Sequence, residues 1–97
     1  MIEAQIIRRP DYKWDVVLVE VQRDEYNSVP GSPVLGLSPY EALMALKRFE
    51  ESGAVRPDAN LFVFDGKGGK LHHGSVARFL LGEFVLEDAG DSSEEPA

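Results

Sequence analysis

A chain of 97 residues with no cysteine holds one domain, and it excludes disulfides, thiolate nucleophiles and zinc ribbons. Its 43% hydrophobic content is ordinary for a globular protein, and no apolar run approaches the roughly 18 residues that a membrane span requires. Most of the net charge of −7 comes from residues 87–97, which carry five acids and no base. Residues 1–86 contain 12 acids and 10 bases, so their net charge is only −2. The first residues also lack the build of a signal peptide, so the sequence predicts a cytoplasmic protein without a membrane segment.

The first 23 residues predict two strands. Ile2, Ala4 and Ile6 alternate with polar residues, which is the period-two pattern of a strand with one buried face. Residues 9–12 form a turn with proline in its second position. Residues 14–23 form the richest strand, which is apolar on both faces at its start and therefore central there. We expect these two strands to pair as an antiparallel hairpin.

A long helix over about 38–52 is the best-marked element of the chain. Ser38 can accept a hydrogen bond from the backbone of Glu41 while the Glu41 carboxylate accepts one from the backbone of Ser38, which makes a capping box. Pro39 stands at the first helical position, where its missing N–H costs nothing, and Gly53 supplies a left-handed stop. The apolar residues that recur at three- and four-residue steps and face the sheet are Ala42, Leu43, Leu46 and Phe49.

The other predicted elements are short. Two prolines and a glycine make residues 24–37 irregular, apart from a short edge strand at 34–37 that leads into the helix. Residues 61–64 are an apolar run typical of a buried strand. A serine can cap a second helix over about 75–81, and the alternative for residues 79–81 is a strand. Residues 84–86 are expected to form the last strand.

These elements predict a single α+β domain over residues 1–86. A single antiparallel sheet of four to five strands packs against one long helix (about 38–52) and a short second helix (about 75–81). Residues 87–97 carry five acids and no base, and they have too little apolar surface to bury. We therefore expect an acidic disordered tail over 87–97.

The order strand, strand, short strand, helix, strand resembles the small sheet-and-helix domain of HicB-type antitoxins. The likeness is carried by Val29-Pro30-Gly31 and by residues 36–43, which read Gly-Leu-Ser-Pro-Tyr-Glu-Ala-Leu. These residues cover under a third of the chain. The resemblance implies a fold only, since one fold hosts many functions.

The glycine-rich loop at residues 66–70 does not match a phosphate-binding motif. A Walker loop requires Ser or Thr after Gly-Lys, but Leu71 follows Lys70. A dinucleotide-binding fingerprint requires a glycine at that same position and a helix directly after it. We therefore interpret the loop as the tip of a hairpin that leads into a strand at residues 71–73, with glycines that supply positive φ.

His72 and His73 are the only histidines, and they do not predict a metal site. Neighbours on a strand point to opposite faces, so the two rings cannot readily chelate one ion. A catalytic histidine would need a positioned partner such as Asp65 or Ser75, and no motif supports that pairing. The sequence predicts no catalytic residue, no metal and no cofactor.

The run between Asp65 and Glu83 contains bases and no acid. Its bases are Lys67, Lys70 and Arg78, accompanied by His72 and His73. If the loop and the second helix are adjacent, these residues form a local positive surface for nucleic-acid phosphates or an acidic partner. The alternative is an ordinary solvated edge, because three bases are few for nucleic-acid binding.

A second group of bases flanks the first turn. Arg8, Arg9 and Lys13 can extend the positive surface or keep an edge strand soluble. Tyr12 and Trp14 lie beside them and can stack on a base. A strand tryptophan is more often a core residue, and we favour that interpretation for Trp14.

The leading functional hypothesis is a non-enzymatic module that binds a partner protein. Its contact is expected in the 24–37 loop, through Asp24, Glu25 and Tyr26, or in the 67–78 region. The alternative is a phage or mobile-element inhibitor that imitates nucleic acid, in the manner of an anti-CRISPR, with acids that include Asp24, Glu25, Glu50 and Glu51. A third hypothesis is a small enzyme that uses His72 or His73, or a nucleic-acid binder that uses the 67–78 region.

Removal of residues 90–97 tests the predicted tail. Because the segment has little to bury, its deletion should leave the melting temperature nearly unchanged. Thermal denaturation followed by circular dichroism compares the shortened chain with the full chain. A clear drop in melting temperature would mean that these residues pack against the domain.

Overall fold

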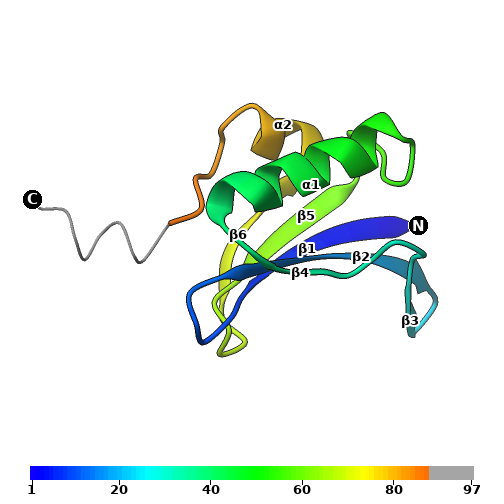
Figure 1. Ribbon diagram of the computed structural model, residues 1–97. Helices are drawn as coiled ribbons and strands as arrows, with labels where there is room; N and C mark the ends of the chain where they lie inside the picture. The colour runs from blue at the N-terminus through cyan, green and yellow to red at the C-terminus, as the bar shows by residue number, and fades with distance from the viewer. Residues whose placement is uncertain (88–97) are drawn as a thin grey trace, which may run out of the picture.

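The computed structural model describes residues 1–87 and has two layers, a six-stranded mixed sheet and two helices on one of its faces (Figure 1). The strands are β1 (Ile2–Arg8), β2 (Trp14–Gln22), β3 (Glu25–Ser28), β4 (Val34–Leu37), β5 (Asn60–Phe64) and β6 (Lys70–Ser75), and the helices are α1 (Pro39–Glu51) and α2 (Val76–Leu80). The strand order is β3-β2-β1-β5-β6, and β4 pairs with the first part of β2. Neither helix is long and apolar enough to cross a membrane.

The expectation of a purely antiparallel sheet is wrong, because β1 and β5 pair in parallel. In this pairing Ala4 lies beside Leu61 and Ile6 beside Val63. Parallel neighbours cannot be joined by a tight turn, so the chain leaves the sheet and returns through α1. The β1–β2 hairpin, in contrast, is antiparallel as expected.

The sheet also has six strands rather than four to five. The additional strand is β3, which lies inside the segment interpreted as irregular from its sequence. All four of its residues are exposed, so no apolar alternation marks it. It forms because Val19–Gln22 of β2 offer unpaired backbone groups, with Val21 opposite Tyr26. Residues 34–37 form the predicted edge strand β4.

Helix α1 begins and ends where the sequence predicts. The Ser38 hydroxyl accepts from the Glu41 N–H at 3.1 Å, and the Glu41 carboxylate accepts from the Ser38 N–H at 2.9 Å. Gly53 follows the helix with a φ of 85°, a conformation that favours glycine. The helix has 13 residues and is of ordinary length. The short helix α2 has five residues between its caps at Ser75 and Leu81, which are the predicted bounds, so residues 79–81 do not form a strand.

The core lies between the sheet and α1. Ala4 and Ile6 of β1 are fully buried, and Ala42 and Leu46 of α1 meet the same cluster. Trp14 is 1% exposed, so it is a core residue and does not offer a ring for base stacking. The largest fully buried side chains are Trp14, Ile6, Leu18, Leu46, Leu61, Val16, Val55, Val63 and Val76.

Residues 82–87 are not part of the sheet, so the predicted last strand at 84–86 is wrong. They form an irregular segment, which we call the strap. Phe84 stacks on His72 of β6 with ring centroids 4.8 Å apart, and Leu86 is buried in the core. The backbone oxygen of Glu87 then accepts a hydrogen bond from the Trp14 indole at 3.2 Å. The strap therefore runs from β6 to β2 on the helix side of the sheet.

Replacing Leu46 with Ala tests the packing of α1. Leu46 is fully buried against the sheet, and truncation of a core leucine costs about 2–5 kcal/mol of unfolding free energy. Chemical denaturation measures this loss. Lys47→Ala is the matched control, because Lys47 is exposed on the same helix and should change stability by no more than about 0.5 kcal/mol. Equal stabilities for the two variants would contradict the packing.

Candidate functional site

Strand β6 separates the basic residues that the sequence groups together. Lys67 and Lys70 lie at the hairpin tip between β5 and β6, whereas Arg78 lies on α2. The strand between them spans about 16 Å at roughly 3.3 Å per residue. The Arg78 guanidinium also pairs with Glu83, with 2.9 Å between their nearest atoms. The 67–78 region thus presents positive charge at two separate places.

His72 faces the helix side of the sheet and contacts the strap. Its side chain is 17% exposed, and its Nε2 lies 3.4 Å from a Glu83 oxygen without forming a hydrogen bond. Gly74 makes room for this pair, because a Cβ at that position would lie 2.7 Å from the Glu83 carboxylate. The Ser75 hydroxyl accepts from the backbone of Arg78 and caps α2, so it is not a partner of the histidine. The arrangement anchors the strap to β6.

His73 points to the opposite face of the sheet, which carries no helix. Its ring stacks on Phe62 at 4.4 Å, and the Lys70 ammonium lies 5.8 Å from the centre of the same Phe62 ring. The two histidines therefore cannot share an ion, as their positions on one strand predict. Within residues 1–87, no group of three or more His, Asp and Glu side chains is placed to hold a metal.

Asp24, Glu25 and Tyr26 lie at the hairpin between β2 and β3. All three are exposed, and the turn is made possible by Arg23, whose φ is 55°. Because β3 and β6 are at opposite ends of the strand order, these residues lie across the sheet from the Lys67 hairpin. The two contact regions expected from the sequence are therefore separate surfaces.

Arg8 and Arg9 line the same depression as Lys67. Strands β1 and β5 are parallel, so the turn after β1 and the loop after β5 leave the sheet at the same end. The two loops enclose a depression of about 510 Å³, which we call the loop cleft. It is lined by Arg8, Arg9, Pro10, Tyr12, Asp65, Gly66 and Lys67.

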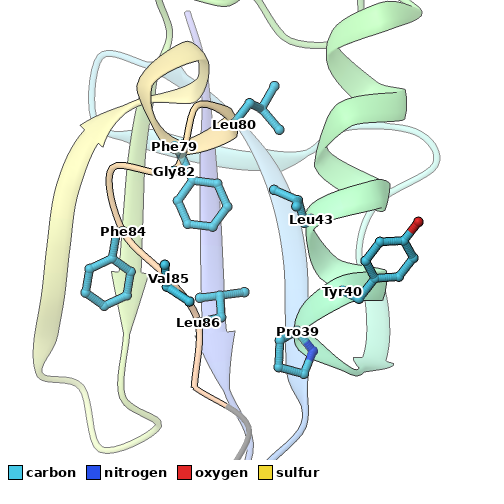
Figure 2. A pocket seen from close by; sticks show the side chains of 9 residues that line it. All are labelled: Pro39, Tyr40, Leu43, Phe79, Leu80, Gly82, Phe84, Val85 and Leu86. Atoms are coloured by element: carbon cyan, nitrogen blue, oxygen red, sulfur yellow. The ribbon is translucent and has the colours of Figure 1, made fainter.

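An apolar groove lies between α1, α2 and the strap (Figure 2). Its volume is about 240 Å³, and none of its lining residues carries a charge. Tyr40 at its rim is 69% exposed and Val85 is 74% exposed. The lining residues are Pro39, Tyr40, Leu43, Phe79, Leu80, Gly82, Phe84, Val85 and Leu86.

The groove is not apparent from the sequence because two segments far apart in the chain, residues 39–43 and 79–86, build it. The run at residues 84–86 was interpreted as a strand, so the exposure of Val85 was not expected. The available signal was Gly82, whose φ of 95° turns the chain after α2 and directs the apolar run along the helix side of the sheet.

No protein-family model matches the chain, and no curated protein or solved structure is similar to it. The likeness to HicB-type antitoxins therefore rests only on the residues quoted for it and stays a prediction. The function has to be argued from the geometry of the two sites.

Replacing Asp65 with Asn tests the rigidity of the hairpin tip. The Asp65 carboxylate accepts hydrogen bonds from the backbone N–H groups of Lys67 and Gly69, both at 2.8 Å. These bonds hold the pKa of Asp65 below its ordinary value of 3.8. A lowered native pKa contributes stability that is present above the ordinary value and is lost as the pH falls through the native value.

We expect the wild-type chain to melt at a higher temperature than Asp65→Asn at neutral pH, with the difference shrinking below about pH 4. Thermal melts from about pH 2 to pH 7 measure it. A difference that stays constant over this range would show that the charge of the carboxylate does not support the loop.

Proposed function

We propose that the protein is a non-enzymatic module that binds a partner protein through the apolar groove. The observation that carries the proposal is the uncharged lining between α1, α2 and the strap, with Tyr40 and Val85 exposed at its rim. Leu81, at the end of α2, is a further exposed apolar side chain. Exposed apolar residues gathered around a concave surface are typical of protein–protein contacts.

The proposed occupant is an amphipathic helix of the partner. The groove is smaller than the roughly 300–1,000 Å³ typical of small-molecule sites, so it suits a few anchoring side chains better than a cofactor. Its lining offers no charge to a phosphate or carboxylate. A groove with apolar walls from two helices is the kind of surface that receives the apolar face of an amphipathic helix.

Catalysis has no part in this proposal. His72 contacts Glu83 and Phe84, and these contacts support the strap that forms one wall of the groove. A partner contact through Asp24, Glu25 and Tyr26, inhibition by imitation of nucleic acid, and a cytoplasmic location all stay predictions of the sequence.

Replacing Val85 with Asp tests the groove. Val85 is mostly exposed, so the change should leave the fold intact while it places a charge where apolar side chains must dock. A photoreactive side chain in place of Val85 first identifies the partner by cross-linking in the native host. Calorimetry with the purified partner should then show at least about tenfold weaker binding for Val85→Asp, a loss of about 1.4 kcal/mol.

Leu35→Asp is the matched control. Leu35 is an exposed apolar residue on β4 and does not line the groove. It should bind the partner within about twofold of the wild type. Equal losses for both variants, or cross-linking from position 35 as efficient as from position 85, would contradict the groove as the contact.

A further inference from the structure

The loop cleft is a preformed site rather than a gap between two mobile loops. Gly66 has a φ of 68°, and a Cβ there would lie 2.4 Å from the backbone oxygen of Arg8, so only glycine lets the two loops approach this closely. On one side, the Tyr12 N–H donates to the Arg9 oxygen at 2.9 Å and closes the β1–β2 turn. On the other, the Asp65 carboxylate binds the backbone of Lys67 and Gly69. Both walls are therefore held by their own hydrogen bonds.

The cleft contains cations that the described part of the chain leaves without acidic partners. Arg8 forms no ion pair within residues 1–87, and its Nε is buried without a hydrogen-bond acceptor. No carboxylate of residues 1–87 lies within ion-pair distance of the Lys67 ammonium. Arg9 differs, because it pairs with Asp15 at 3.3 Å and with Asp11 at 3.6 Å. Together with backbone hydrogen bonds, the Lys67 ammonium helps to lower the pKa of the Asp65 carboxylate. Within residues 1–87, however, neither Lys67 nor Arg8 has an acidic partner at ion-pair distance, and such cations are suited to an anion.

An aromatic ring stands beside these cations. Tyr12 is 59% exposed and has a φ of 68°, a conformation that a tyrosine rarely adopts. The Arg8 guanidinium lies 5.0 Å from the centre of the Tyr12 ring and 5.7 Å from that of Trp14, so the two rings fix its orientation. Because Trp14 is buried, Tyr12 is the ring that can receive a ligand.

We propose that the loop cleft binds single-stranded nucleic acid, with Arg8 and Lys67 on a phosphate and the Tyr12 ring stacked on a base. A nucleobase can stack on the exposed Tyr12 ring, and such stacking stabilises single-strand complexes. An acidic peptide would leave this ring without a stacking partner. Lys70 is a further exposed base on the same hairpin, and its ammonium lies over Phe62 outside the cleft, so a strand can reach it where a mononucleotide cannot. The cleft shares no lining residue with the apolar groove, so the two proposals are independent.

Fluorescence anisotropy with a labelled 12-nucleotide oligouridine tests the proposal on the full chain. The net charge of −7 opposes association, so the titration starts at about 50 mM salt, where we expect binding in the micromolar range. Lys67→Gln should weaken binding about tenfold and should reduce the slope of log affinity against log salt by about 0.7, the value for one phosphate contact on a single strand. Tyr12→Ala should weaken binding about tenfold and leave that slope unchanged, while Tyr12→Phe should bind as the wild type does.

Arg48→Gln is the matched control, because Arg48 is an exposed base in the last turn of α1 and lies outside the cleft. It should bind within about twofold of the wild type. Arg8→Gln removes a half-buried guanidinium that packs against the Tyr12 and Trp14 rings and can disturb the fold, so Lys67 at the exposed tip carries the decisive comparison. The proposal would be overturned by a lack of binding at 50 mM salt, or by equal losses of affinity for Lys67→Gln and Arg48→Gln. It would also be overturned if uridine monophosphate bound as tightly as the oligonucleotide in a competition titration.

Discussion

The position of β1 between an antiparallel and a parallel neighbour is the constraint on which the rest of the molecule depends. Its pairing with β2 needs only a short turn, but its parallel pairing with β5 requires the chain to cross over the sheet. Helix α1 makes that crossing and covers the face that carries Ala4 and Ile6. The same pairing brings the turn after β1 and the loop after β5 to one end of the sheet. The core, the open sheet face and the loop cleft all follow from it.

Local signals predicted the parts of the fold that local interactions decide. The capping box of Ser38 and Glu41 and the stop at Gly53 are complete within one stretch of sequence, and α1 lies where they place it. The parallel pairing and β3 could not be predicted in this way. The first depends on contacts between strands more than 50 residues apart in the chain, and the second is a polar strand that exists only because β2 offers it a free edge.

The candidate sites follow the same division. Proximity in sequence grouped Lys67 with Arg78, but an extended strand holds such residues apart, and Arg78 has its own partner in Glu83. The pairing of distant strands instead places Lys67 and Arg8 around one cleft, whereas from the sequence Arg8 was expected only to extend the positive surface or to keep an edge strand soluble. The apolar groove was missed because the position of the strap depends on two long-range contacts, Phe84 on His72 and Trp14 on Glu87. His72 and His73 were predicted to point to opposite faces of the sheet, because successive side chains alternate along a strand whichever strands it pairs with.

The hydrogen bond from the Trp14 indole to the Glu87 oxygen gives the protein an internal optical reporter. Trp14 is the only tryptophan, so the emission that is excited at wavelengths which the three tyrosines do not absorb comes from this one ring. Its N–H is satisfied by the end of the strap and its ring is enclosed by the core. Detachment of the strap would expose the indole to water, and its emission would shift to longer wavelength while the backbone of the sheet stayed intact. Opening of the groove wall can therefore be followed in unlabelled protein, separately from unfolding.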